Sequence, residues 1–301
     1  MLPALLFRGQ NPTLTLRAMF PYLGFILYFY LLTTKPSLKW LVRLIWFLAF
    51  LYIVVYLFSL TQLPDVIFGS FADKDVDDNR GLFRLFIPGR GFLFLAFFMA
   101  VSNYLYSKRA LWLWIAAGLF MVIVAHVIRQ YILFSFIIAG WVLFWNVSLW
   151  KKMIFLLLGV ITGYYVYLYS PVIQTLISLT EVQVVDNVPT ENIRITAYRY
   201  FFTEFSPNSI SSIFGNGVPH AHSSYGRYYN GVINDQMRLY FSDVGYAQIY
   251  AQFGAIGLLA VICIFIRAFF VKIPAEFLYL KLFIVFVFFA NIMSGYFLSN
   301  H

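Results

Sequence analysis

The sequence predicts an all-α polytopic membrane protein with about eight transmembrane helices. Of its 301 residues, 62% are hydrophobic and 11% are charged, and the mean hydropathy is +0.80. A water-soluble domain of this length cannot hide so much apolar surface in one core, so lipid is expected to surround it. Several apolar runs reach the ~17–25 residues that a helix needs to cross a bilayer. These runs are continuous and do not alternate, which argues against barrel strands.

The apolar runs divide the chain into spans and two hydrophilic segments. The predicted spans are roughly residues 16–34, 40–60, 91–106, 110–128, 131–149, 153–170, 245–266 and 277–297. Together they are expected to form a single transmembrane domain over residues 1–301. Residues 61–90 are expected to form an outer loop with an interfacial helix, and residues 171–244 a large outer loop.

Basic residues in the short connections predict the orientation. Every second connection carries lysine or arginine, and such connections remain in the cytoplasm. These residues are Lys35, Lys39, Arg43, Lys108, Arg109, Lys151, Lys152, Arg267 and Lys272. Both long segments and both termini are therefore expected on the outer side. The formal charge of +9 reports this topology and does not require a nucleic-acid partner.

Arginine dominates the basic residues expected on the outer side, where Lys74 is the one lysine. The arginines are Arg8, Arg17, Arg80, Arg84, Arg90, Arg129, Arg194, Arg199, Arg227 and Arg238. A guanidinium binds phosphate or carboxylate with two parallel hydrogen bonds, whereas an ammonium acts as a point charge. This bias favours a bound anion at the membrane surface. The alternative is that individual arginines pair with carboxylates of the outer loops.

The stretch NRGLFRLFIPGRGF, residues 79–92, has the pattern of an interfacial segment that leads into the third span. Arg80 and Arg84 stand one helical turn apart, and we expect them to hold a lipid phosphate. Arg90 follows at the start of the apolar run.

The stretch VIVAHVIRQYILF places His126 and Arg129 between the fourth and fifth spans. They are three residues apart and are expected on one helix face near the outer surface. A charged group at this depth is costly and indicates function by default. The alternative is an arginine that reaches to the head groups from a tight helical hairpin.

Residues 190–205 of the large outer loop are expected to form a helix, because residues 192–205 lack Gly and Pro. Arg194 and Arg199 lie on this helix and project about 140° from each other. The side chains expected to lie on the membrane are Ile195, Phe202 and Phe205.

The stretch GNGVPHAHSSYGRYY, residues 215–229, opens with a turn signal and carries two of the four histidines. In an extended chain His220 and His222 point the same way. No third histidine or cysteine accompanies them, and the one cysteine, Cys263, lies in an apolar run, which disfavours a zinc site. Acid–base work or anion binding suits them. The alternative is that they are solvated loop residues without a role.

The end of the outer loop carries an acidic residue and several tyrosines. Asp243 stands before the seventh span, where capping the helix is the expected role and contact with a sugar hydroxyl a further one. Stacking faces for sugars are expected from Tyr225, Tyr228, Tyr229, Tyr240 and Tyr246.

With these residues in view, the chain resembles the bacterial O-antigen polymerase and O-antigen ligase superfamily. The matching stretches are LRAMFPYLGFILYFYLL, VIRQYILF, NIRITAYRYF, IFGNGVPHAHSSYG and SDVGYAQIYAQFGAIGLL. They extend over most of the chain. Their order and predicted topology support the resemblance more than any single stretch does.

The resemblance implies a fold related to the lipid-dependent (GT-C-related) glycosyltransferases, in the bacterial cytoplasmic membrane, with the active site on its outer (periplasmic) side. Members of the superfamily transfer glycan from an undecaprenyl-pyrophosphate carrier to an acceptor sugar without a metal, and no other cofactor is expected. Arg129 with Arg194 or Arg199 would then hold the donor pyrophosphate. His222, or else His220, would help the acceptor hydroxyl attack.

The resemblance favours a polymerase of lipid-linked repeat units. Ligases typically show a His-Asn pair close to the next span, whereas Ser223 follows His222 here. Arg227, Asp243 and Arg84 are further candidates for binding substrate or lipid. A chain-length regulator and a flippase are the expected protein partners. Three alternatives remain, an O-antigen ligase, a transporter of lipid-linked sugars and a non-catalytic scaffold of an envelope glycan assembly. The transporter is disfavoured because the second, third, fifth and sixth predicted spans have few polar residues near the bilayer midplane and the chain shows no clear repeat.

Overall fold

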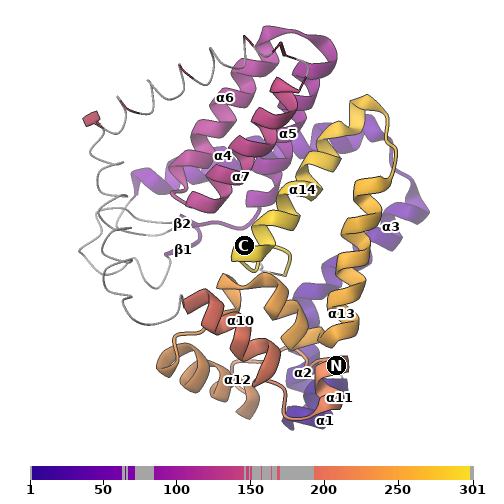
Figure 1. Ribbon diagram of the computed structural model, residues 1–301, viewed down its shortest axis with the longest axis vertical. Helices are drawn as coiled ribbons and strands as arrows, with labels where there is room; N and C mark the ends of the chain where they lie inside the picture. The colour runs from indigo at the N-terminus through magenta and orange to yellow at the C-terminus, as the bar shows by residue number, and fades with distance from the viewer. Residues whose placement is uncertain are drawn as a thin grey trace. The chain divides into compact units, whose positions relative to one another are not determined.

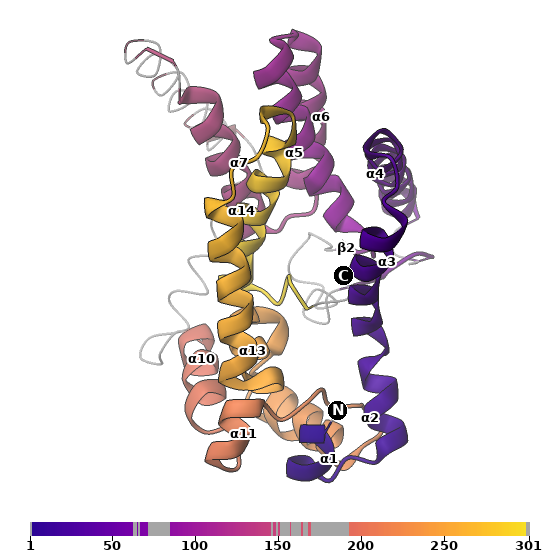
Figure 2. The same ribbon diagram turned by 90° about the vertical axis from the view of Figure 1, so that its right-hand side faces the viewer.

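The computed structural model describes residues 2–62, 65, 67–71, 85–145, 147, 148 and 193–298, with isolated residues at 150, 157, 164, 168 and 169. The chain is mostly helical and forms two compact units (Figures 1 and 2). Unit 1 comprises Met1–Phe50, Asn192–Pro274 and Phe283–His301, and unit 2 comprises Leu51–Glu191 and Ala275–Leu282.

Four helical segments are long and apolar enough to cross a membrane. They are Pro12–Thr34, α4 (Leu38–Thr61), α13 (Gly245–Phe270) and Ala275–Met293, which consists of η4 (Ala275–Phe277) and α14 (Leu278–Met293). They coincide with the first, second, seventh and eighth predicted spans. The prediction of a helical membrane protein is therefore confirmed at this level.

The first of these segments has three parts, α2 (Pro12–Met19), η1 (Phe20–Ile26) and α3 (Leu27–Thr34). Its middle part is wound as a 3₁₀-helix, and Pro21 stands there. Proline has no amide hydrogen, so it cannot donate the hydrogen bond that would continue an α-helix. The change of winding between α2 and α3 follows from this residue.

Unit 2 contains three apolar helices that pack on one another, α5 (Arg90–Ser107), α6 (Ala110–Ala125) and α7 (Arg129–Phe144) (Figures 1 and 2). The last two have 16 residues each. At 1.5 Å per residue a helix of this length measures about 24 Å, which is shorter than the ~30 Å hydrocarbon core. The predicted span 153–170 lies almost entirely outside the described residues, so eight spans remain a prediction.

The strands β1 (Ser70–Phe71) and β2 (Leu85–Phe86) form a short antiparallel pair. Residues 85 and 86, where the sequence predicts an interfacial helix, are thus in a strand. Residues 72–84, which include the candidate lipid ligand Arg84, lie outside the described residues.

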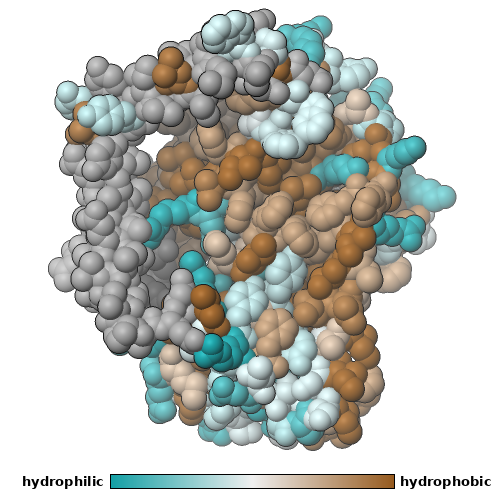
Figure 3. Space-filling model, viewed as in Figure 1, coloured by the Kyte–Doolittle hydropathy of each residue, from teal (hydrophilic) through white to brown (hydrophobic). Residues whose placement is uncertain are grey.

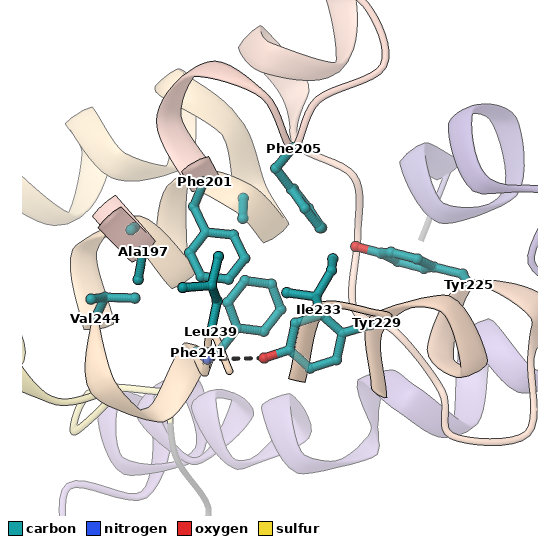
Figure 4. Packing of buried hydrophobic residues seen from close by; sticks show 11 residues of the cluster. Ala197, Phe201, Phe205, Tyr225, Tyr229, Ile233, Leu239, Phe241 and Val244 are labelled. Carbon is teal, nitrogen blue, oxygen red and sulfur yellow. Dashed lines mark hydrogen bonds between the residues drawn. The ribbon is translucent and has the colours of Figure 1, made fainter. Parts of the chain in front are cut away.

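Unit 1 also contains short helices outside the long segments. They are α1 (Leu2–Arg8), α10 (Ile193–Thr203), α11 (Ser209–Phe214), α12 (Ser224–Tyr228), the π-helix η2 (Tyr229–Gln236) and the 3₁₀ turn η3 (Phe241–Asp243). Residues of α10, α12, η2 and η3 form a core with Ala247 and Ala251 of α13. Aromatic rings fill this core (Figure 4). The ring of Phe241 lies 4.3 Å from that of Tyr229 and 4.6 Å from that of Phe201, centroid to centroid. The hydroxyl of Tyr229 accepts a hydrogen bond from the Phe241 amide at 2.9 Å.

This core corrects one prediction for the helix of the outer loop. The helix itself is confirmed over the described residues as α10, with Ile195 exposed. Phe205, expected on the membrane, is instead buried in the core next to Phe201, because the chain turns inward after α10. Phe202 is half-buried, and its ring lies tilted against that of Tyr250 of α13, with the centroids 4.7 Å apart.

The surface of unit 1 changes character along its length. Figure 3 shows mostly pale and teal side chains over α10 and α12, and mostly brown ones along α13. The exposed apolar side chains of α13 include Ile256, Leu259, Ile264 and Phe270. Polar groups therefore gather on the short helices, while the long helix presents the apolar surface that a membrane span needs.

Candidate functional site

The histidine-bearing loop, residues 215–223, is held by the N-terminal residues of the chain. Gln10 is 1% exposed, and its side-chain oxygen accepts hydrogen bonds from the His220 amide at 3.0 Å and the Ser223 hydroxyl at 2.8 Å. Its side-chain nitrogen donates to the Val218 carbonyl at 3.1 Å. A single glutamine thus fixes three positions of the loop, and a buried amide that uses both its ends orients its partners strictly.

The GNG turn at the start of this loop fits into a break in α13. Gly254 interrupts that helix with φ 72°, which frees carbonyl groups of the preceding turn. The Ala251 carbonyl accepts from the backbone and side-chain nitrogens of Asn216 at 2.9 and 3.0 Å, and the Gln252 carbonyl accepts from the Gly217 amide at 2.9 Å. The loop therefore replaces the missing hydrogen bonds of α13.

Arg8 serves the same loop from the N-terminal side. Its Nε donates to the Asn216 side-chain oxygen at 3.0 Å, and its Nη2 donates to the Phe205 carbonyl. The guanidinium also lies over the rings of Phe205 and Tyr225, at 4.5 and 5.0 Å from their centroids. Arg8 was predicted among the outer arginines that favour a bound anion, but its fork is used inside the protein.

The two histidines lie side by side at the end of the loop. His220 is half-buried and His222 is exposed, with their ring centroids 5.5 Å apart. The His222 amide donates to Nδ1 of His220 at 3.2 Å, so in the neutral ring of His220 the proton is on Nε2. Both rings therefore lie on one anchored segment, and that of His222 is accessible from outside the protein.

The turn after the histidines leads into α12. Ser223 caps this helix by accepting from the Gly226 amide at 2.8 Å. A side chain at Gly226 would overlap the His220 carbonyl, so the small residue allows the helix to approach the loop closely. Arg227 follows on α12 and is exposed.

The remaining predicted site residues fall in both units. Arg194 and Arg199 are exposed on α10 of unit 1. Arg129 is exposed at the first position of α7 in unit 2. The structure thus brings His220, His222, Arg194, Arg199 and Arg227 into one unit, and places Arg129 in the other.

Two predictions about helix ends are wrong. His126 and Arg129 do not share a helix, because α6 ends at Ala125, α7 begins at Arg129, and Val127 between them has φ 57°. Asp243 does not cap α13, because it lies in η3 and the N-cap residue is Val244, whose side chain has no polar atom.

The tyrosines of the outer loop divide into buried and accessible ones. Tyr225 and Tyr229 belong to the core, where burial raises the pKa of both phenols, and they cannot stack on a sugar as predicted. Tyr228 is 42% exposed. Burial raises the pKa of Tyr198 to about 12, and its hydroxyl donates to the Ile292 carbonyl at 2.6 Å. The phenols of Tyr198, Tyr225 and Tyr229 are therefore neutral at physiological pH.

Unit 2 contains a buried aromatic and histidine cluster that the sequence did not predict. The Tyr52 hydroxyl lies 2.6 Å from Nε2 of His126, and Nδ1 of His126 lies 2.7 Å from the Val122 carbonyl. The carbonyl only accepts, so Nδ1 carries the proton and Tyr52 donates to Nε2. Tyr56 stacks on His126 with centroids 4.1 Å apart. Arg90 lies close enough to act electrostatically on both Tyr52 and His126.

No protein-family model, curated protein or solved structure matches the chain. Within the described parts of the sequence, no group of three or more His, Cys, Asp or Glu side chains comes together as metal ligands. The resemblance to glycan polymerases and the role of each site residue therefore remain predictions.

Proposed function

We propose that the chain is a membrane glycosyltransferase that polymerises undecaprenyl-pyrophosphate-linked repeat units into a surface polysaccharide. The observation that carries the proposal is the anchored loop of unit 1, in which Gln10 fixes the backbone beside His220 and His222. This loop belongs to the same unit as α13, which is long and apolar enough to cross a membrane. A lipid-linked substrate needs a polar site of this kind attached to helices in the bilayer.

The proposed reaction gives the loop and the arginines separate roles. The acceptor hydroxyl attacks the anomeric carbon of the donor sugar, the bond to the diphosphate oxygen breaks, and the lipid diphosphate leaves with the bonding electrons. His222 accepts the hydroxyl proton, for which an exposed imidazole near neutral pH is suited. Arginine side chains stabilise the charge that develops on the diphosphate.

The candidates for this electrostatic role are Arg129, Arg194 and Arg199, and all three are exposed. Arg129 occupies the first position of α7, where the backbone amides and the helix dipole also favour an anion. Arg227 lies on α12, one residue before the exposed ring of Tyr228, which provides a face for a sugar. Within unit 1, Arg227 and Tyr228 therefore support binding of a phosphorylated glycan.

A transporter of lipid-linked sugars is the second candidate, and the break of α13 at Gly254 favours it. Broken helices in transporters expose backbone carbonyls to substrate or coupling ions. Here the carbonyls of Ala251 and Gln252 already accept from Asn216 and Gly217. Because the loop uses them, the enzyme remains the better-supported proposal.

The test is chain extension by the purified protein. It would be reconstituted with undecaprenyl-pyrophosphate-linked repeat units, and the products separated on a gel. His222→Ala and the double variant Arg129→Ala/Arg199→Ala should each lower extension by about a hundredfold or more. Arg17→Ala, an exposed arginine at the end of α2, is the matched control and should retain activity. Full extension by the double variant contradicts the assignment, and movement of the lipid across liposomes without extension supports the transporter.

A further inference from the structure

Arg90 is a buried cation, and two of its three guanidinium nitrogens have no hydrogen-bond partner in the part of the chain that the structure describes. It is 3% exposed, and neither Nε nor Nη1 has a partner among the described residues. Its guanidinium lies 5.0 Å from the ring centroid of Tyr131 and 5.4 Å from that of Phe86. Aromatic faces attract a cation, but they do not accept the directed hydrogen bonds of two N–H groups.

Three physical effects oppose this arrangement. Removing a charge from water is costly unless an opposite charge compensates it. Leaving its N–H groups without acceptors adds a desolvation penalty. Arg90 is also the first residue of α5, where the positive end of the helix dipole disfavours a cation. A single bound anion would relieve all three effects.

Unit 2 offers no internal anion for this purpose among its described residues. The sequence has no Asp or Glu between Asp78 and Glu181. The described carboxylates of unit 2 are Asp65 and Glu276, and both are exposed. The neighbouring Tyr52 and His126 are neutral hydrogen-bonding groups that satisfy each other.

The second arginine of this region has a related position. Arg129 is the first residue of α7, as Arg90 is of α5, and the two helices are in contact. Tyr131, two residues after Arg129, contributes the ring beside Arg90. Two helix N-termini and two guanidinium groups thus belong to one region of unit 2. Helix N-termini themselves favour anions.

We infer that Arg90 binds a phosphate group of a membrane amphiphile at the N-terminal ends of α5 and α7. The phosphate oxygens would accept from Nε and Nη1, and the acyl or isoprenoid chain would remain in the lipid. The inference rests on the proposed function only in its choice of a diphosphate lipid as the first compound to be tested. A phospholipid head group and a soluble phosphate present the same chemistry, and the test separates these sources.

The experiment measures binding and thermal stability of the full chain in detergent. The probes are farnesyl diphosphate, phosphatidylglycerol and inorganic pyrophosphate, and the variants are Arg90→Met and Arg90→Lys. Wild-type protein should bind farnesyl diphosphate or phosphatidylglycerol and be stabilised thermally by it. Arg90→Met should weaken that binding by about tenfold or more, and Arg90→Lys should weaken it less, since lysine keeps the charge but not the fork. Arg109→Met, at the N-cap of α6, is the exposed control in the same unit.

The stability of the unliganded protein gives an independent readout. Without ligand, Arg90→Met should melt at a higher temperature than wild type, because it removes a buried charge that has no partner. The inference is overturned if Arg90→Met melts lower and binds every probe like wild type, since Arg90 is then satisfied within the protein. Binding of pyrophosphate alone also overturns it, because the ligand is then not an amphiphile. If the wild-type protein binds the amphiphile through Arg90 but does not extend glycan chains, the proposed function is contradicted and the phosphate site at Arg90 is still supported.

Discussion

Replacing Gln10 tests whether the N-terminal residues fix the histidine-bearing loop. Its side chain makes four hydrogen bonds, to Thr15 at 3.2 Å, Val218 at 3.1 Å, His220 at 3.0 Å and Ser223 at 2.8 Å. Gln10→Ala removes all four. Ser223 retains the His220 carbonyl, 2.7 Å from its hydroxyl, as another acceptor, whereas the His220 amide and the Val218 carbonyl lose the partner described here.

The magnitude follows from these losses. A buried donor or acceptor left without a partner costs about 1–3 kcal/mol, and a net hydrogen bond contributes roughly 0.5–1.5 kcal/mol. The His220 amide and the Val218 carbonyl together therefore give a loss of about 2–6 kcal/mol in the free energy that holds the loop closed. At about 1.4 kcal/mol per factor of ten, amide exchange in residues 216–223 should accelerate by roughly 30-fold or more.

The assay is hydrogen–deuterium exchange of the detergent-solubilised protein, read out on peptides that cover residues 216–223. Gln236→Ala is the matched control, because Gln236 is an exposed glutamine of the same unit. Gln10→Glu keeps an acceptor for His220 but loses the two donor bonds, so its effect should be smaller than that of Gln10→Ala. If exchange in Gln10→Ala equals that in Gln236→Ala, the N-terminal residues do not hold the loop.

Three further changes test the packing of each unit by thermal unfolding in detergent. Gly254→Ala should lower the free energy of unfolding by roughly 2 kcal/mol or more, since the position has φ 72° and no room for a side chain. The control Gly118→Ala, in open space on α6, should be neutral. Equal melting temperatures of the two variants would contradict the break in α13. Phe201→Ala should lower the free energy of unfolding by about 3–5 kcal/mol, and Phe201→Leu by less, because the ring is fully buried. A change below ~0.5 kcal/mol, which is typical of a surface residue, would contradict the core of unit 1. Tyr52→Phe should lower the free energy of unfolding by about 1–3 kcal/mol, because Nε2 of His126 loses its hydrogen-bond donor. An unchanged melting temperature would show that the hydrogen bond between Tyr52 and His126 does not form.

The membrane class and the long helices follow from local properties of the sequence. An apolar run of sufficient length specifies a helix in lipid wherever it stands in the chain. For the same reason α10 was predictable, because its sequence lacks Gly and Pro over the whole helix. The sequence also placed a boundary between two helices near His126 and Arg129. It did not show that these two residues belong to different helices, because that follows from the turn at Val127, which has φ 57°.

The arrangement of the site depends on contacts that no local pattern reveals. Gln10 and His220 are 210 positions apart in the sequence, and Arg8 and Asn216 are 208 positions apart. A buried glutamine near an N-terminus looks like any polar residue until its partners are known. Gly254 could be interpreted as a small residue for helix packing, since only its positive φ marks a break. The sequence places Arg90 at the start of an apolar run. It does not show that the side chain is buried, which is the observation that indicates a bound anion.

The folded unit changes what the histidine-bearing segment can do. A loop on the outer side of a membrane protein is expected to be mobile, and a mobile base contributes little to catalysis. Here the segment is attached to α13 through Asn216 and Gly217 and to the N-terminal residues through Gln10. The loop that carries His222 is therefore attached to α13, which is long enough to cross a membrane, and to the residue Gln10, which lies two positions before the other such segment, Pro12–Thr34. Preorganisation of this kind is what a glycosyl transfer at a lipid surface requires, and it would be lost in any variant that releases either attachment.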